Sequence, residues 1–87
     1  QNYIQNTIGV LEKHDKENDS ELLETLNQLI LCMGVKTQAA QNLFLHRNTL
    51  MYRIKKIEQL TGYNLADKNH LLSLAIAMKF YPFVKNK

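Results

Sequence analysis

The 87 residues fit one small domain, and a content of 45% apolar and 22% charged residues is typical of a folded chain rather than a disordered one. No apolar run approaches the length of a membrane span, which excludes a membrane helix, and no signal peptide opens the chain. The net charge of +3 is uneven: six acids and two bases precede Gly34, whereas five bases and one acid lie from Gly34 to Tyr63, which favours a polyanionic partner.

Two helices are expected in the acidic first part. Apolar residues at helical spacing predict a first helix over about residues 2–13, and the polar stretch HDKENDS predicts a connector after it. A second helix is expected from a capping box of Asn18 and Glu21 to about Met33, where Gly34 stops it by accepting left-handed backbone angles. The residues expected on its buried face are Leu22, Leu26, Leu29, Ile30 and Met33.

A short third helix is expected next, with Thr37 as its N-cap. Its small residues, Ala39 and Ala40, would let a neighbouring helix approach closely. Phe44 and Leu45 should end this helix, because the next four residues, HRNT, are polar and open a new apolar pattern.

A basic fourth helix, capped by His46 or Asn48, is expected to reach about Thr61, with Gly62 as its stop. On a helical wheel its buried face consists of Leu50, Ile54 and Ile57. Its outward residues are Asn48, Tyr52, Lys55 and Gln59, flanked by Met51 and Lys56, with Arg47 at the N-terminal tip.

A last helix is expected from about Asp67 to Phe80, ending before Pro82. It is almost entirely apolar, so it is either deeply enclosed or covers a partner subunit. Since the chain has no strand pattern and no internal repeat, the sequence predicts an all-α fold of about five helices.

The third and fourth helices have the spacing of a helix-turn-helix, in which a short helix braces a second one in the major groove of DNA. Paired alanines, a leucine three residues later, a three-residue turn and RNTL opening a basic helix favour this interpretation over a merely solvated basic face. Arginine can donate two hydrogen bonds to guanine, asparagine can pair with adenine, and methionine can touch the thymine methyl. Lysine, tyrosine and backbone N–H groups at helix starts can hold phosphates.

The sequence therefore predicts a single helix-turn-helix domain over residues 1–87 that binds double-stranded DNA. It divides into a leading helix and connector (1–17), a helix-turn-helix core (18–62) and an apolar C-terminal helix (63–87). Because one such domain contacts few base pairs, we expect a homodimer, formed through the first helix, the last helix or missing sequence. The alternative is a protein-interaction or dimerisation module without DNA contact, and RNA binding is disfavoured by the lack of several exposed aromatic residues.

The stretch from Leu22 to Leu65 resembles the C-terminal helix-turn-helix domain of the PucR/CdaR regulators, named for purine catabolism and sugar-diacid utilisation. The resemblance extends over roughly residues 8–80. The segments that carry it are LLETL, the alanine pair, HRNTL, YRIKKIEQLTG and the final LLSLAIAMKF. It implies a bacterial transcription factor whose DNA-binding domain follows a sensory region. The start at Gln1 without methionine agrees with a fragment of a longer regulator.

The resemblance also implies which residues meet DNA. The recognition helix would begin with His46, Arg47, Asn48 and Thr49 and carry Met51, Tyr52, Arg53, Lys55 and Lys56 along its length, and Thr37 and Gln38 would add contacts from the helix before it. On the wheel Arg53 lies toward the buried face, so we expect it to reach a phosphate or to pair internally. Tyr52 is expected to be exposed, whereas Met51 could pack or contact DNA. Glycine is common in such turns where Phe44 stands, which leaves the turn's backbone conformation open.

No pattern in the sequence indicates an enzyme, a cofactor or a metal site. His14, His46 and His70 lack cysteines or carboxylates at a metal-ligand spacing, and His46 is better explained as a cap or a phosphate contact. The single cysteine, Cys32, is expected to be a core thiol and suits a cytoplasmic protein. No Ser–His–Asp set, glycine-rich phosphate loop or pair of catalytic acids can be assembled.

Overall fold

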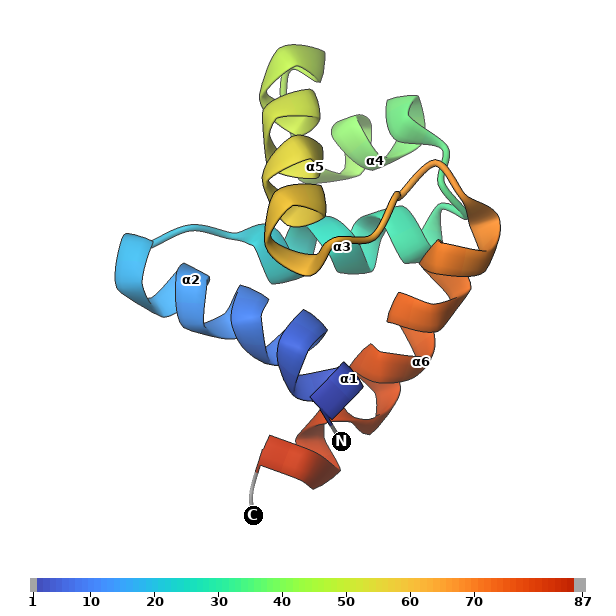
Figure 1. Ribbon diagram of the computed structural model, residues 1–87. Helices are drawn as coiled ribbons and strands as arrows, with labels where there is room; N and C mark the ends of the chain where they lie inside the picture. The colour runs from blue at the N-terminus through green and yellow to red at the C-terminus, as the bar shows by residue number, and fades with distance from the viewer. Residues whose placement is uncertain (1, 86–87) are drawn as a thin grey trace.

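The computed structural model describes residues 2–85, and within this range it holds five helices and no strand (Figure 1), which confirms the all-α prediction. The first helix is continuous through three segments: α1 (Asn2–Ile4), the π-helical η1 (Gln5–Gly9) and α2 (Val10–Asn18). The others are α3 (Leu22–Leu31), α4 (Lys36–Leu43), α5 (Arg47–Thr61) and α6 (Lys68–Lys85). No helix among the described residues is long and apolar enough to cross a membrane.

The first helix is longer than expected, and the prediction of a connector from residue 14 was wrong. The helix continues to Asn18 and ends where Asp19 adopts a left-handed conformation, with φ of 53°. The predicted capping box was also wrong, because no side-chain cap comes from the residues next to α3. Instead the carboxylate of Asp15, inside α2, accepts the N–H groups of Leu22 at 2.8 Å and Leu23 at 3.0 Å. One acid thus fixes the corner between two helices.

The link from α3 to α4 differs from the prediction in two details. Met33 lies beyond the end of α3 in a left-handed conformation and is largely exposed, so it does not belong to the buried face. Helix α4 begins at Lys36 with Val35 as its N-cap residue in an extended conformation, so Thr37 lies inside the first turn and is not the cap. Gly34 has a φ of 86°, which agrees with its predicted role at the end of α3.

The turn between α4 and α5 keeps the left-handed geometry that glycine favours although Phe44 occupies the position. Phe44 has φ 56° and ψ 43°, and 93% of its surface is exposed. Its N–H donates to Gln41 O at 3.2 Å, and the next N–H, of Leu45, donates to Ala40 O at 2.9 Å. These two bonds close the end of α4, so the turn is well formed with a residue that lacks glycine's freedom.

Replacing Phe44 with valine should therefore destabilise the domain by about 1–2 kcal/mol, because a β-branched residue is strained at positive φ. Since the Phe44 side chain is almost fully exposed, little buried area is lost in the change. Phe44→Gly is the matched control and should leave the free energy of unfolding nearly unchanged. Urea denaturation of the two variants checks this, and equal losses for both would show that the backbone conformation is not the cause.

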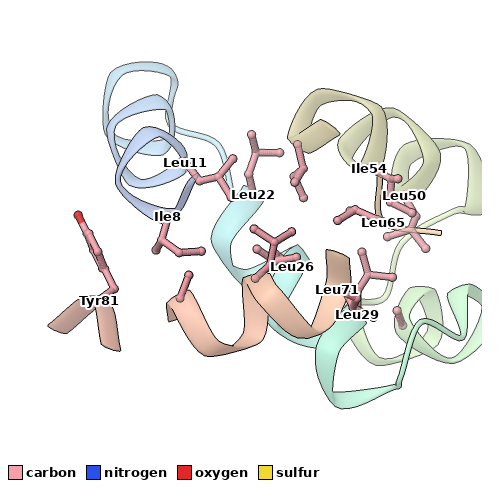
Figure 2. Close-up of a cluster of buried hydrophobic side chains, with 14 of the residues drawn as sticks. Ile8, Leu11, Leu22, Leu26, Leu29, Leu50, Ile54, Leu65, Leu71 and Tyr81 are labelled. Carbon is pink, nitrogen blue, oxygen red and sulfur yellow. The ribbon is translucent and has the colours of Figure 1, made fainter. Parts of the chain in front are cut away.

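The core lies where the first helix, α3, α5 and α6 meet, and Figure 2 shows side chains from these helices pointing toward one another. The predicted buried face of α5 is confirmed, since Leu50, Ile54 and Ile57 are all buried. On α4 the buried residues are Ala39 and Ala40, whose small side chains let α4 pack closely against α3 and α5. The two helices of the helix-turn-helix, α4 and α5, therefore both pack against α3.

Helix α6 runs through Pro82 to Lys85, so the prediction that it ends before the proline was wrong. The inner face of α6 packs on the first helix and is anchored near Pro82 by the buried Tyr81, whose hydroxyl donates to the carboxylate of Glu12. Burial, followed by this hydrogen bond, raises the pKa of Tyr81 to about 12. This packing offsets the cost of the proline, which has no N–H to donate to the preceding turn of the helix.

Candidate nucleic-acid interface

The start of α5 is fixed by a side chain, which gives the candidate interface a defined geometry. Residues 44–46 form the turn after α4, and His46 is the N-cap of α5 with an extended backbone, φ −66° and ψ 148°. Of the two caps considered from sequence, the structure uses His46: its Nδ1 accepts the N–H of Asn48 at 3.0 Å. The side chain of Asn48 is left exposed and turned to solvent. Gly62, with φ 79°, ends α5 as predicted.

Replacing His46 with alanine should destabilise the domain by roughly 0.5–2 kcal/mol, because the Asn48 N–H loses its acceptor at the start of α5. His46→Asn keeps an N-cap acceptor and should restore most of the loss. Thermal unfolding monitored by circular dichroism compares the variants. An alanine variant as stable as the parent would mean that the imidazole does not support the helix.

The outward face of α5 presents several polar and basic side chains that have no protein partner. Arg47, Thr49, Tyr52 and Lys55 are exposed, Tyr52 by 67% as expected. Within residues 2–85, the side chains of Arg47 and Lys55 take part in no hydrogen bond or ion pair. An unpaired guanidinium at a helix tip retains its full capacity to bind an anion or a base edge.

The tip of α5 and the start of α4 line a common hollow of about 230 Å³. Lys36 and Thr37 contribute from α4, and Arg47 and Met51 contribute from α5. Met51 lines this hollow and exposes about one-third of its surface. It can therefore pack against the fold and still be accessible to a partner. The structure brings Thr37 next to the recognition-helix residues, and it adds Lys36, which the sequence analysis missed. The sequence did offer an indication for Lys36, because it lies in the first turn of the helix that precedes the turn at residues 44–46.

Gln38 is also exposed but is partly committed to the protein. Its Nε2 donates to Asn42 Oδ1 at 3.0 Å, and Asn42 Nδ2 donates in turn to Gln28 Oε1 of α3 at 3.1 Å. The same Asn42 amide lies 3.5 Å from the sulfur of Cys32, which is partly buried against the core. This chain of amides ties α4 to α3 on the side of α4 away from Arg47's hollow.

Arg53 differs from Arg47 because its guanidinium is used within the fold. Its Nη1 donates to Thr25 Oγ1 at 3.1 Å and lies 3.6 Å from Glu21 Oε1. Thr25 is completely buried in α3, and its hydroxyl donates to the carbonyl of Glu21 at 2.8 Å. Of the two possibilities left open from sequence, the structure shows the internal pair. Sequence reasoning missed its partner, although a threonine within the apolar face of α3 was a signal.

The electrostatic environment differs on the two sides of α5. The single acid between residues 34 and 63, Glu58, accepts the N–H of Leu65 at 2.9 Å and lies near the far end of the helix. On the other flank, a hollow of about 620 Å³ separates Tyr52 and Lys56 from the corner between α2 and α3, which carries Asp19 and Glu21. The tip and the α4 side are therefore positive, whereas the α2–α3 side carries acids as well as the bases Arg53 and Lys56.

No group of three His, Cys, Asp or Glu side chains in the described part of the chain is arranged to hold a metal ion. The two hollows beside α5 differ in their lining: the one at the tip carries the cations Lys36 and Arg47 and no acid, whereas the one at the α2–α3 corner carries both acids and bases. The hollow at the tip therefore offers cationic and hydroxyl groups that can hold an anion.

The comparisons with known proteins agree with this geometry. The sequence profile of the PucR C-terminal helix-turn-helix domain matches residues 22–80, which is most of the chain. The chain belongs to this family. The match spans α3, α4, α5 and most of α6, so the PucR-type domain includes α3 and the apolar α6 as well as the helix-turn-helix. Membership makes it a domain of DNA-binding transcriptional regulators and not an enzyme, as the sequence predicts.

Curated relatives include three regulators of Bacillus subtilis (strain 168). The proline-responsive transcriptional activator PutR is 42% identical over 66 residues, which are 75% of this chain and 16% of PutR. The purine catabolism regulatory protein is 31% identical over 77 residues, 88% of this chain and 14% of the relative. The DNA-binding transcriptional activator AdeR is 30% identical over 73 residues, 84% of this chain and 17% of AdeR. The chain thus spans about one-sixth of these relatives, and no solved structure matches it significantly.

Proposed function

We propose that this PucR-type domain binds duplex DNA sequence-specifically by inserting α5 into the major groove, as the output domain of a longer cytoplasmic transcriptional regulator. The observation that carries the proposal is the contrast between two arginines of one helix. Arg53 is held by Thr25 and Glu21, whereas Arg47 stands exposed and unpaired at the tip, among other exposed polar groups. A fold that neutralises one arginine and leaves the other open keeps the second available for a partner.

Each of these exposed side chains, and the half-buried Lys56, has a role that its chemistry supports. Arg47 and Asn48 at the tip can donate to base edges, and Met51 can touch a thymine methyl. Thr49, Tyr52, Lys55 and Lys56 can contact phosphates along the groove, which would give binding that weakens steeply with salt. His46 would act mainly by capping α5, with its ring at the edge of the groove.

Helix α4 supports the proposal through its backbone. No side chain caps its N-terminus, so the N–H groups of its first turn, including those of Thr37 and Gln38, are open to an acceptor. Such a helix start attracts phosphate through its N–H groups and its dipole. Lys36 and the Thr37 hydroxyl lie at the same place and add a charge and a further donor. In this arrangement α4 would grip the backbone while α5 reads the bases.

The charge asymmetry limits how DNA can approach. Phosphates would be attracted more strongly to the flank of α5 that faces Lys36 and Arg47, where no acid lines the hollow, than to the flank that faces Asp19 and Glu21. We infer that the more closely held phosphate backbone lies on the α4 side of α5, and that Tyr52 and Lys56 face the other strand. The helix-turn-helix core of residues 18–62 would then carry all direct contacts, and the leading helix and α6 would support it from behind.

A single module of this size would read only a few base pairs, so useful specificity requires two copies on adjacent half-sites. The relatives PutR and AdeR are transcriptional activators by name, and the proline response of PutR belongs to that protein. For this chain we propose DNA output alone and assign no effector.

In-vitro selection of the chain against random duplex DNA, at near-physiological salt, tests the proposal. Two enriched half-sites about one helical turn apart would support a paired DNA reader. A single short motif would support DNA reading by one copy. No enrichment by a chain that is folded by circular dichroism would overturn the proposal. An excess of single-stranded RNA serves as competitor and should not displace the selected duplex.

A further inference from the structure

The outer side of α6 is a second apolar face that the fold does not cover. Its inner residues are buried, while Leu72, Ile76, Phe80 and Phe83 point outward and expose 47–71% of their surfaces. These four are spaced by four, four and three residues, which places them within a sector of about 80° on a helix. The spacing is that of a seam along which a helix packs against a partner.

The apolar surface continues from α6 onto the end of α3. Leu31 and Met33 expose 66% and 75% of their surfaces. Two shallow hollows, of about 180 and 230 Å³, lie between α3 and α6, and both are lined by Ile30 and Ala75. We call this surface the outer α3–α6 face; its exposed apolar residues are Leu31, Met33, Leu72, Ile76, Phe80 and Phe83.

The area of the outer α3–α6 face is large for a domain of this size. Since a phenylalanine side chain carries roughly 150–250 Å², Phe80 and Phe83 together expose on the order of 200–300 Å², and the four aliphatic side chains, each exposed by 47–75%, add to this area. The largest apolar patch on a typical monomer is about 300–600 Å². One partner in a stable protein–protein interface contributes about 800 Å². The face therefore offers nearly the area that one half of a dimer needs.

The charges around the face fit a partner that carries the same surface. Lys68 and Lys79 line the hollows at the α6 edge, and Asn27 and Leu31 line one hollow from α3. Glu24 is exposed and lies one turn before Asn27 on the same side of α3. In a two-fold symmetric contact, Glu24 of one copy can approach Lys68 or Lys79 of the other copy.

We propose that the outer α3–α6 face is the surface through which two copies of this chain pair. The choice of a second copy rests on the proposed function, because reading two half-sites requires two domains held together. The face is also compatible with DNA binding, since α6 runs away from the start of α5 (Figure 1). Pairing there would leave both recognition helices free.

Sedimentation equilibrium of the chain, from low micromolar to near-millimolar concentration and without DNA, tests the pairing. The parent chain is expected to approach twice the monomer mass, and Ile76→Asp should shift it to the monomer mass by burying an unpaired charge in the seam. Phe44→Asp is the matched control, because it changes an equally exposed apolar residue outside the face. A parent chain that stays monomeric, or an Ile76→Asp chain that stays dimeric, would overturn the proposal.

A second measurement keeps the proposal testable if Ile76→Asp unfolds. We place the two-fold axis at Ile76, in the middle of the α6 seam, so Ile76→Cys in a Cys32→Ser background should meet its own counterpart and form an intermolecular disulfide under mild oxidation. Lys13→Cys, on the exposed side of α2, is the control and should not cross-link. Cross-linking at equal rates in both would contradict the assigned face.

The failure of this proposal is distinguishable from the failure of DNA binding. If the chain binds DNA but does not pair through this face, Ile76→Asp and the parent chain bind a duplex with two half-sites with equal cooperativity. If DNA binding fails alone, the parent chain is a dimer that enriches no sequence. If both hold, Ile76→Asp loses cooperative binding to two half-sites but still binds one, whereas Arg47→Ala weakens both and remains dimeric.

Discussion

Replacing Leu26 with alanine is expected to lower the free energy of unfolding by about 3–5 kcal/mol, the largest loss from any single truncation that we predict. Leu26 is completely buried, and Figure 2 shows its side chain at the centre of the core cluster. It lies on α3, the helix against which α2, α4, α5 and α6 all pack. The alanine would leave a cavity between rigid helices that cannot all close on it.

The loss would be a large part of the total, since small domains unfold with only about 5–15 kcal/mol. Leu31→Ala is the matched control, because Leu31 is on the same helix but two-thirds exposed, and its change should stay below about 1 kcal/mol. Urea denaturation followed by circular dichroism measures both. Equal losses would mean that α3 is not the centre of the core, or that Leu31 is covered in a dimer. Repeating the measurement with Ile76→Asp as background separates the two.

The parts of the fold that sequence predicted well are those decided by neighbouring residues. Helix α5 begins after His46 and ends at Gly62, and both signals lie within a few residues of the ends that they define. Its buried face follows from spacing alone. The left-handed turn at Phe44 was less evident, because its conformation is imposed by the hydrogen bonds that close α4 and not by the residue itself.

The parts that were mispredicted depend on contacts between distant residues. The end of α2 was placed too early because HDKEN looks like a loop, yet Asp15 is helical and caps the next helix at the same time. Helix α6 passes Pro82 because the buried Tyr81 beside it is anchored to the first helix, about seventy residues away in the chain. A sequence pattern does not contain such partners.

The candidate site divides in the same way. The exposure of Arg47 and Tyr52 followed from the wheel, since residues opposite a buried stripe face solvent. The link from Arg53 to Thr25 could not be identified without the packing of α5 on α3, although the wheel showed that Arg53 was unlike Arg47. Lys36 joined the site only when the fold placed the start of α4 beside the tip of α5.

Replacing Arg47 with alanine is expected to weaken binding to a selected duplex by about 1–3 kcal/mol, or roughly 5- to 150-fold in Kd. The loss should be specific to sequence: discrimination at one base pair relaxes, while binding to unrelated DNA changes less. Because the Arg47 side chain makes no hydrogen bond or ion pair within the described residues, stability should change by less than about 0.5 kcal/mol. Fluorescence anisotropy over a series of single-base variants measures the effect.

Two other basic residues of α5 make the result decisive. Lys55→Ala should weaken binding to all sequences alike and lower the salt dependence by about one ion, as expected of a phosphate contact. Arg53→Ala should act through stability instead, because it leaves the buried Thr25 hydroxyl without the guanidinium that it accepts from. Three variants of one helix would then differ in three measured quantities: base preference, salt slope and unfolding free energy. If Arg47→Ala behaved like Lys55→Ala, α5 would hold DNA without reading it at its tip, and base choice would have to come from Asn48 or from α4.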